Sequence, residues 1–116
     1  MRNDARVFLS DIHDCIKKIE EYMRGVKREK FLEEIQLQDA VMRRLEIIGE
    51  AAKNVSLEVR KKYPDIPWKK MAGLRDVLIH TYFGVNLERV WIVVKYDLPD
   101  LKKKIKKILE DLENEI

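Results

Sequence analysis

The sequence predicts an all-α protein, an up-and-down bundle of four main helices and one short helix. Only four glycines and three prolines interrupt its 116 residues, and both residue types punctuate helices. No stretch shows the sustained alternation of apolar and polar residues that is typical of a strand. Apolar residues instead recur every three or four positions, the spacing of one helix face. A chain of this length fits one core, so we expect a single helical domain over residues 1–116.

The first predicted helix is capped by Asn3 or Asp4 and stops at Gly25, which accepts the left-handed conformation of a helix end. One apolar stripe runs along it: Phe8, Ile12, Cys15, Ile16, Ile19, Tyr22 and Met23. Cys15 is the only cysteine, which excludes an internal disulfide and a multi-cysteine zinc site. Its place on the stripe indicates a buried, inert thiol.

A longer helix is predicted from about Lys30 to Val55. Its apolar residues span an arc of roughly 200° at 100° per residue, which needs more than one neighbour and makes this the central helix. They are Leu37, Ala40, Val41, Leu45, Ile47, Ile48, Ala51, Ala52 and Val55. A polar line occupies the opposite side: Asp39, Arg43, Glu46 and Glu50. It is either a solvated face with mutual ion pairs or a wall that faces a partner or a cleft.

The second half of the chain predicts shorter helices. Ser56 can cap a short helix from Leu57 to about Lys62, and Pro67 suits the start of a helix from Trp68 to about Phe83 that ends at Gly84. Asn86 can cap another helix, and Asp97-Leu98-Pro99 is expected to interrupt or kink the path. The last helix carries Leu101, Ile105, Ile108, Leu112 and Ile116.

Charged residues make up 39% of the chain, and the net charge of +3 is compatible with a phosphate backbone but too small to prove nucleic-acid binding. The abundance of Lys and Glu is a weak hint of a hot environment. Basic residues crowd three regions: residues 102–107, Arg60-Lys61-Lys62 and Lys69-Lys70. Each is usually a solvated helix face, although the last two precede residues 75–82 and could help attract a phosphate backbone. Without an apolar leader or a membrane-spanning run, we expect a soluble, cytoplasmic protein that does not bind membranes.

One arginine breaks the apolar pattern. On a helix from Trp68 to Phe83, Arg75 falls in the middle of the face formed by Trp68, Met71, Leu78, Ile79 and Tyr82. A guanidinium keeps its charge, so a core-facing position is costly without a partner. Arg75 is therefore either a structural arginine, which reaches solvent or pairs with a carboxylate across the bundle, or a functional one.

A histidine follows on the same helix. His80 lies roughly 140° round the helix from Arg75, and Asp76 lies one turn before His80, within reach of the imidazole. Asp76 and the helix C-terminus both favour the imidazolium and are expected to raise the pKa of His80. A histidine that titrates near neutral pH suits proton transfer, although a histidine at a helix end is more often structural.

Arginine and histidine together indicate phosphodiester chemistry. Metal-independent RNA cleavage needs a base for the 2′-hydroxyl proton, a cation for the charged transition state and an acid for the leaving oxygen. The chain has no cluster with metal-ligand spacing, and we expect neither a metal nor a cofactor. On one helix Arg75 and His80 point apart, so a composite site requires a symmetric dimer that brings one pair from each subunit together.

The motif Arg75-x-x-x-x-His80-x-Tyr82 resembles the signature of HepT-like toxins of the HEPN superfamily. The polar Asp76 directly after the arginine fits that pattern, as do the flanking segments 37–52, 73–74 and 96–101. The resemblance covers nearly the whole chain. It implies a HEPN-like dimeric bundle with metal-independent endoribonuclease activity, in which Arg75 and His80 are catalytic.

The same resemblance implies a regulated toxin. Its partner would be a minimal nucleotidyltransferase that acts as antitoxin by adding AMP to the tyrosine of the motif, Tyr82. A second hypothesis is a non-catalytic helical dimer that scaffolds or binds such a nucleotidyltransferase. A third is a generic helical core in which Arg75 and His80 are structural.

Overall fold

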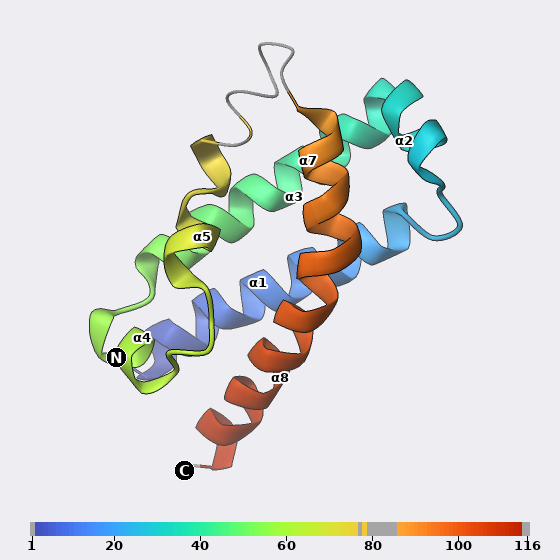
Figure 1. Cartoon of the computed structure of the whole chain (residues 1–116). Coiled ribbons are helices and arrows are strands. Elements are labelled where there is room, and N and C mark those ends of the chain that lie inside the picture. Colours follow the sequence, from blue (N-terminus) through green and yellow to red (C-terminus); the bar gives the residue numbers. More distant parts are fainter. Residues whose placement is uncertain (1, 77, 79–85, 115–116) are drawn as a thin grey trace.

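The computed structural model describes residues 2–76, 78 and 86–114, and within these ranges every regular element is a helix (Figure 1). This confirms the all-α class. The elements in chain order are α1 (Arg2–Tyr22), α2 (Arg28–Glu33), α3 (Ile35–Asn54), α4 (Leu57–Lys62), α5 (Trp68–Ala72), α7 (Leu87–Ile92), the π-helix η1 (Val93–Asp97) and α8 (Leu98–Asn114). Residues 74–76 and 78 are also helical.

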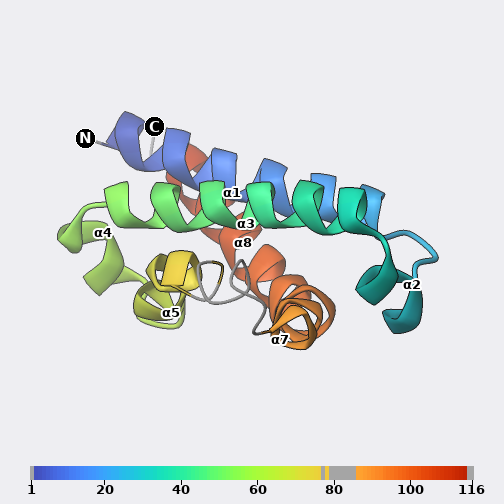
Figure 2. The same cartoon turned by 90° about the horizontal axis from the view of Figure 1, so that it is seen from above.

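The central position of α3 is confirmed. Helices α1 and α3 run antiparallel and side by side, and α5 and α7 lie on the other side of α3 (Figure 2). Helix α8 starts beside α7 and crosses to the layer of α1, which it contacts (Figure 2). The core lies where these helices meet. Its fully buried large side chains include Leu9, Ile12, Ile16, Ile19, Val41, Leu45, Ile48, Val90 and Ile105.

Two local predictions are confirmed, and a third is confirmed only in the position of the residue. Helix α1 ends at Tyr22, and Gly25 adopts the left-handed conformation, with φ +71°. The Ser56 hydroxyl accepts a hydrogen bond from the Val59 backbone N–H at 3.3 Å and so caps α4. Asn86 stands at the N-cap position of α7, although its side chain makes no capping hydrogen bond.

The prediction of one helix from about Lys30 to Val55 is wrong at its beginning. The backbone leaves the helical conformation at Glu34, with φ −98° and ψ 103°, and this separates α2 from α3. The break lets α2 turn so that Phe31 becomes fully buried, with its ring centre 6.0 Å from that of Trp91. The buried amide of Gln38 donates to the Phe31 carbonyl at 2.9 Å, which satisfies a backbone group that the break would leave without a partner.

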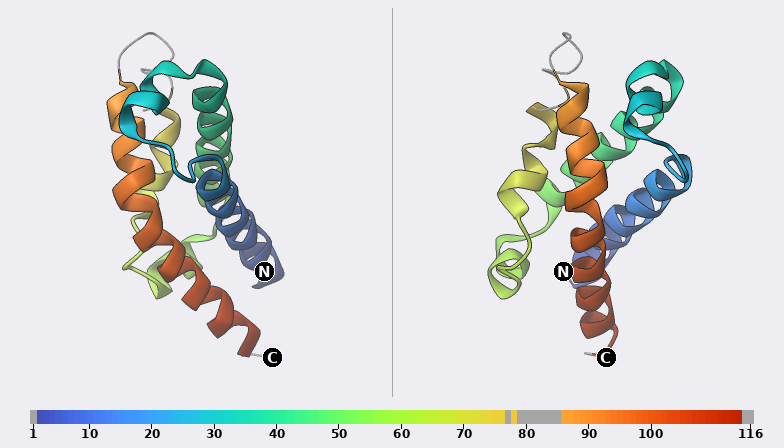
Figure 3. Two further views of the ribbon diagram at one scale, coloured as in Figure 1. Left: turned by 90° about the vertical axis from the view of Figure 1, so that its right-hand side faces the viewer. Right: turned by 45° about the vertical axis from the view of Figure 1, so that its right-hand side comes forward.

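The expected interruption near Pro99 takes another form. Helix α7 passes directly through η1 into α8 along one continuous path (Figure 3). The Leu98 N–H donates to the Val93 carbonyl, five residues back, so the widened turn lies just before the proline. Pro99 then sits in the first turn of α8, where an intrahelical N–H is not required.

The prediction of one helix from Trp68 to Phe83 is also wrong in the described part of that segment. Helix α5 ends at Ala72, and a turn at Gly73 precedes the next helical residue, Leu74. The turn changes the helical phase, so positions before and after it do not belong to one wheel. Trp68, Met71, Leu74 and Leu78 are the buried residues of this segment.

Candidate active site

Arg75 forms an ion pair with Glu50 of α3. Its Nη1 atom lies 3.4 Å from Glu50 Oε1, and the two side chains are 60% and 52% exposed. The predicted place of Arg75 on the core-facing stripe is therefore wrong. The turn at Gly73 gives the buried position to Leu74 and leaves Arg75 facing solvent beside α3. The pair with a carboxylate from another helix is the arrangement that one of the two interpretations of Arg75 anticipated.

A glycine sets the register between these two segments. A Cβ atom at Gly49 would lie 3.3 Å from the Met71 carbonyl oxygen and 3.7 Å from the Leu74 Cβ. Only a residue without a side chain permits this close approach without a shift of the neighbouring backbone. Glu50 directly follows Gly49 on α3, and Arg75 directly follows Leu74. Each of the two contacting segments therefore carries one member of the ion pair right after the contact. The packing of Gly49 thus determines where the guanidinium stands.

The side chains on the polar line of α3 form two kinds of ion pair, one within the helix and one to another segment. Arg43 pairs with Glu46 at 3.0 Å on the same helix, as a solvated face would. Glu50 instead reaches across to Arg75. Glu50 belongs to the polar line that the sequence predicts, and a wall facing a cleft is one of the two interpretations of that line. The sequence does not identify Arg75 as the partner of Glu50. A glycine in the middle of a long apolar helix is a signal of close packing, and Gly49 was available as that signal.

The remaining residues of the predicted site are placed only in part. Asp76 is exposed, and its backbone N–H donates to the Gly73 carbonyl at 3.0 Å. His80 and Tyr82 lie outside the described residues. The proposed contact between Asp76 and His80 and the separation of Arg75 from His80 therefore stay predictions.

Two other titratable side chains lie away from this site. Cys15 is buried, as predicted, and burial raises the pKa of its thiol. His13 of α1 has a buried Nε2 atom, and this atom has no hydrogen-bond partner among the described residues. Burial and then the charge of Lys102 lower the pKa of His13. Within residues 2–76, 78 and 86–114, no group of three or more His, Cys, Asp or Glu side chains could hold a metal ion.

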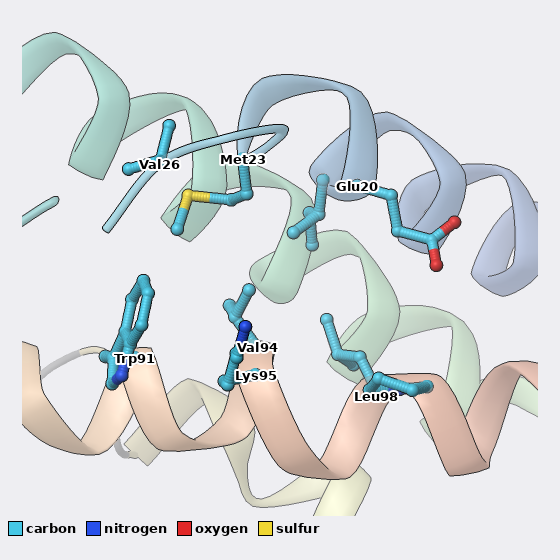
Figure 4. Close-up of a pocket in the computed structure, with 9 residues that line it drawn as sticks. Glu20, Met23, Val26, Trp91, Val94, Lys95 and Leu98 are labelled. Atoms are coloured by element: carbon cyan, nitrogen blue, oxygen red, sulfur yellow. The ribbon is translucent and has the colours of Figure 1, made fainter. Parts of the chain in front are cut away.

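A cavity of about 230 Å³ lies between the end of α1 and the path from α7 to α8 (Figure 4). Trp91 and Lys95 line one side, and Met23 and Val26 line the other. Its lining contains neither member of the Glu50–Arg75 pair. The Glu50–Arg75 pair instead lies on an exposed surface of the chain, where a second molecule can contribute further residues to a site.

No helix in the described ranges is long and apolar enough to cross a membrane.

Residues 12–108 match the protein family described as "Ribonuclease HepT-like". The chain belongs to the HepT-like ribonuclease family. It is 45% identical over 108 residues to a "Probable ribonuclease HepT" of Thermococcus cleftensis, and the match covers 93% of this chain and 98% of that protein. Membership of this HepT-like family implies an RNA substrate.

Two relatives from Methanocaldococcus jannaschii agree with this assignment. "Putative RNase MJ1216" is 42% identical over 112 residues, which are 97% of this HepT-like chain and 93% of the relative. "Gamma-glutamylcyclotransferase and putative RNase MJ0434" is 50% identical over 113 residues, 97% of this chain. The HepT-like chain spans 51% of that longer relative. A comparison with solved structures gave no match.

Proposed function

We propose that this HepT-like chain is the toxin of a toxin–antitoxin pair, a metal-independent endoribonuclease with Arg75 and His80 as its catalytic residues. The observation that carries the proposal is an exposed guanidinium held at a set place by Glu50 and by the packing of Gly49. A phosphate can reach an exposed guanidinium, and a planar guanidinium binds phosphate oxygens through two parallel hydrogen bonds. A buried arginine could do neither.

The proposed reaction uses the RNA's own 2′-hydroxyl as the nucleophile. His80 takes the 2′-hydroxyl proton, and the 2′-oxygen forms a bond to the adjacent phosphorus. Arg75 stabilises the negative charge that accumulates on the phosphoryl oxygens. The bond from phosphorus to the 5′-oxygen breaks, and that oxygen takes a proton from a general acid. The products are a 2′,3′-cyclic phosphate and a 5′-hydroxyl, so no water and no cofactor is consumed.

A homodimer is part of this proposal. Two-fold symmetry places the same surface of both subunits against each other, so one exposed Arg75 and its partner's counterpart can line a common cleft. Light scattering on the purified chain tests this directly. A mass near twice the 13.9 kDa of one chain is expected, and a monomer at micromolar concentration would contradict the composite site.

Regulation is proposed to act on Tyr82. In the proposed reaction the tyrosine oxygen attacks the α-phosphorus of ATP, pyrophosphate leaves, and AMP stays attached through a phosphodiester. The added anion could pair with Arg75 and exclude the RNA phosphate. Incubation with the proposed nucleotidyltransferase partner and ATP, followed by peptide mapping, tests this. A Tyr82→Phe protein that the partner still modifies and silences would contradict it.

The catalytic proposal is tested by cleavage of labelled single-stranded RNA in EDTA. Wild type and Arg43→Ala are expected to cut the RNA, because Arg43 is also an exposed arginine in an ion pair but belongs to the solvated face of α3. Arg75→Ala and His80→Ala are expected to lose cleavage and to lose toxicity in a bacterium without the partner. Full activity of either variant, or loss of wild-type cleavage in EDTA, would contradict the mechanism. A wild type that binds the nucleotidyltransferase but cuts no RNA would favour the scaffold hypothesis.

A further inference from the structure

The cavity of about 230 Å³ between the end of α1 and the path from α7 to α8 has an apolar lining, and the proposed ribonuclease site does not use it (Figure 4). Seven of its nine lining residues are apolar: Ile19, Met23, Val26, Trp91, Val94, Leu98 and Pro99. Most of these side chains are only half-buried, so the cavity reaches the surface. A hollow of this kind can take a large apolar side chain from another molecule.

One wall of the cavity is built on Trp91. The Trp91 ring centre lies 6.0 Å from that of the fully buried Phe31, so the indole has a fixed support. Val94 and Lys95 on the same wall come from η1, and widened helical turns occur often at functional sites. Tryptophan is among the residue types most enriched at the energetic centres of protein interfaces. This wall therefore has the composition of a binding surface.

The apolar surface continues outside the cavity on the same helical path. Ile92 is 51% exposed and Tyr96 is 67% exposed. Each directly follows a residue of the cavity lining, Trp91 or Lys95. Four residues apart, the two side chains are neighbours on one helix face. Contiguous exposed apolar surface next to an apolar hollow is typical of a protein interaction site.

The charge balance at the cavity begins with its two charged lining residues. Glu20 is neutralised by an ion pair, because the Lys102 Nζ atom lies 2.7 Å from Glu20 Oε1. Lys95 is exposed, and its Nζ atom lies 6.0 Å from the centre of the Trp91 ring. This cation–π contact leaves the charge of Lys95 without a compensating carboxylate within the described ranges. The uncompensated charge in the lining is therefore positive.

The neighbouring charges add to this balance. In the two stretches that line the cavity, residues 19–28 and 91–100, three cations are exposed and form no ion pair: Arg24, Lys27 and Lys95. Arg28 is not counted because it pairs with a glutamate of α7. The aspartates of these stretches pair with lysines as well. Glu21 is the one unpaired carboxylate there, so the three cations, here called the basic rim, outnumber it.

We propose that the cavity and the exposed face formed by Ile92 and Tyr96 bind an acidic amphipathic helix of a partner protein. One large apolar side chain of that helix enters the cavity, and its carboxylates meet the basic rim. Helices bind grooves through apolar anchors three and four residues apart, which suits a cavity beside a helix face. The proposal does not depend on the proposed ribonuclease function.

Two other occupants fit this surface less well. In a two-fold dimer the surface would meet itself, so the basic rims of both subunits would come together. An RNA base would bury its polar edges against aliphatic side chains such as Met23, Val94 and Leu98, which offer no hydrogen bonds. An acidic helix with an apolar face avoids both penalties.

The test is binding of a fluorescein-labelled synthetic helix of roughly 15 residues, which is about 22 Å long at ~1.5 Å per residue. Leu and Phe occupy one face of the peptide and Glu the other. The full chain is expected to bind it, and added salt is expected to weaken binding. A peptide with Lys in place of Glu, and one with Ser in place of Leu and Phe, are expected to bind at least tenfold more weakly. Equal binding of all three would overturn the proposal.

Two variants of the chain locate the binding site. Lys27→Glu/Lys95→Glu reverses two charges of the basic rim and is expected to bind the acidic peptide on the order of tenfold more weakly. Lys18→Glu/Lys107→Glu changes the net charge equally through two exposed lysines outside the cavity lining, and is expected to bind like wild type. Equal affinities of these two variants would overturn the proposal.

The cavity itself is tested by Val94→Phe, which fills it, with circular dichroism as the control for folding. The variant is expected to bind the acidic peptide several-fold more weakly than wild type. Wild-type affinity in a folded Val94→Phe protein would exclude the cavity as the place of the apolar anchor.

The other occupants give different results. If the rim variant alone changed the mass in light scattering, the surface would belong to a second copy of the chain. If it alone lost RNA binding, the surface would belong to RNA, and either result would overturn the proposal. Cleavage by the rim variant is expected to match that of its charge-matched control. If wild type cuts RNA but does not bind the peptide, only the docking surface fails, whereas peptide binding without cleavage contradicts only the proposed function.

Discussion

The antiparallel pair α1–α3 and the short segment 68–78 both contribute side chains to the core, but they differ in length, regularity and exposure. The interface of α1 with α3 buries large aliphatic side chains over many turns, among them Leu9, Ile16, Leu45 and Ile48. The segment 68–78 adds four buried side chains to the core, Trp68, Met71, Leu74 and Leu78, but it is interrupted at Gly73 and carries the exposed Arg75. It approaches α3 most closely at Gly49. Most of the stability is therefore expected from the first region and the proposed chemistry from the second, so substitutions in the two regions should have different effects.

The largest effect on stability is expected from the first region. Ile48 of α3 is fully buried, so Ile48→Ala is expected to lower the free energy of unfolding by about 2–5 kcal/mol, through lost burial and a residual cavity. Denaturant unfolding followed by circular dichroism measures this. Cleavage per folded molecule at low temperature is expected to stay near wild type. A loss below ~1 kcal/mol would mean that α3 is not central to the core.

A smaller effect is expected where the two regions touch. Gly49→Val places side-chain atoms against the Met71 carbonyl and is expected to cost about 1–3 kcal/mol through overpacking. Because the shift displaces Leu74 and with it Arg75, cleavage is expected to fall as well. Gly49→Ala is the graded control, since a gain of up to ~1 kcal/mol in helix propensity offsets the milder contact. A fully active and stable valine variant would contradict the proposed role of Gly49.

The ion pair itself is expected to contribute little to stability. Arg75→Ala and Glu50→Gln are each expected to change the free energy of unfolding by less than about 1 kcal/mol, because both partners are more than half exposed. Arg43→Ala, which breaks the exposed pair with Glu46, is the matched control and is expected to behave alike. Only Arg75→Ala is expected to abolish cleavage. A large loss of stability for Arg75→Ala alone would instead support a structural arginine.

The smallest effect concerns pH. Burial and Lys102 lower the pKa of His13, so the unfolded chain binds this proton more readily than the folded chain. Stability is therefore expected to fall as the pH drops below about 6.5, the ordinary pKa of histidine. His13→Asn is expected to flatten the decline in urea midpoint between about pH 7 and 5. An identical decline in both proteins would assign it to other groups.

Features set by local chemistry are predicted better from the sequence than features set by tertiary contacts. The left-handed Gly25 after α1 and the cap of α4 at Ser56 follow from local chemistry, and both are found as predicted. The breaks at Glu34 and Gly73 depend on tertiary contacts, the burial of Phe31 in one case and the approach of Gly49 in the other. Periodicity cannot reveal such breaks, because residues on both sides have ordinary helical patterns.

The failure to predict the break at Gly73 also misplaced Arg75 in the predicted site. Arg75 was identified from the sequence because it breaks an apolar pattern, yet that pattern assumed a continuous helix through Gly73. The observed reason for its placement is its pair with Glu50, which lies 25 residues away. A contact over that separation needs the fold. The helical wheel therefore gave a wrong reason for selecting Arg75 as a site residue. The selection depends instead on the motif in which Arg75 stands.

We propose that the surface around Arg75 cleaves RNA through the substrate's own 2′-hydroxyl. The most direct measurement is the fate of one labelled RNA in EDTA, compared with the same oligonucleotide carrying a single 2′-deoxy residue at the mapped cleavage position. The RNA fragment is expected to end in a 2′,3′-cyclic phosphate, and no cleavage is expected at the deoxy position. Cleavage at the deoxy position, or fragments that end in a 3′-hydroxyl, would contradict it.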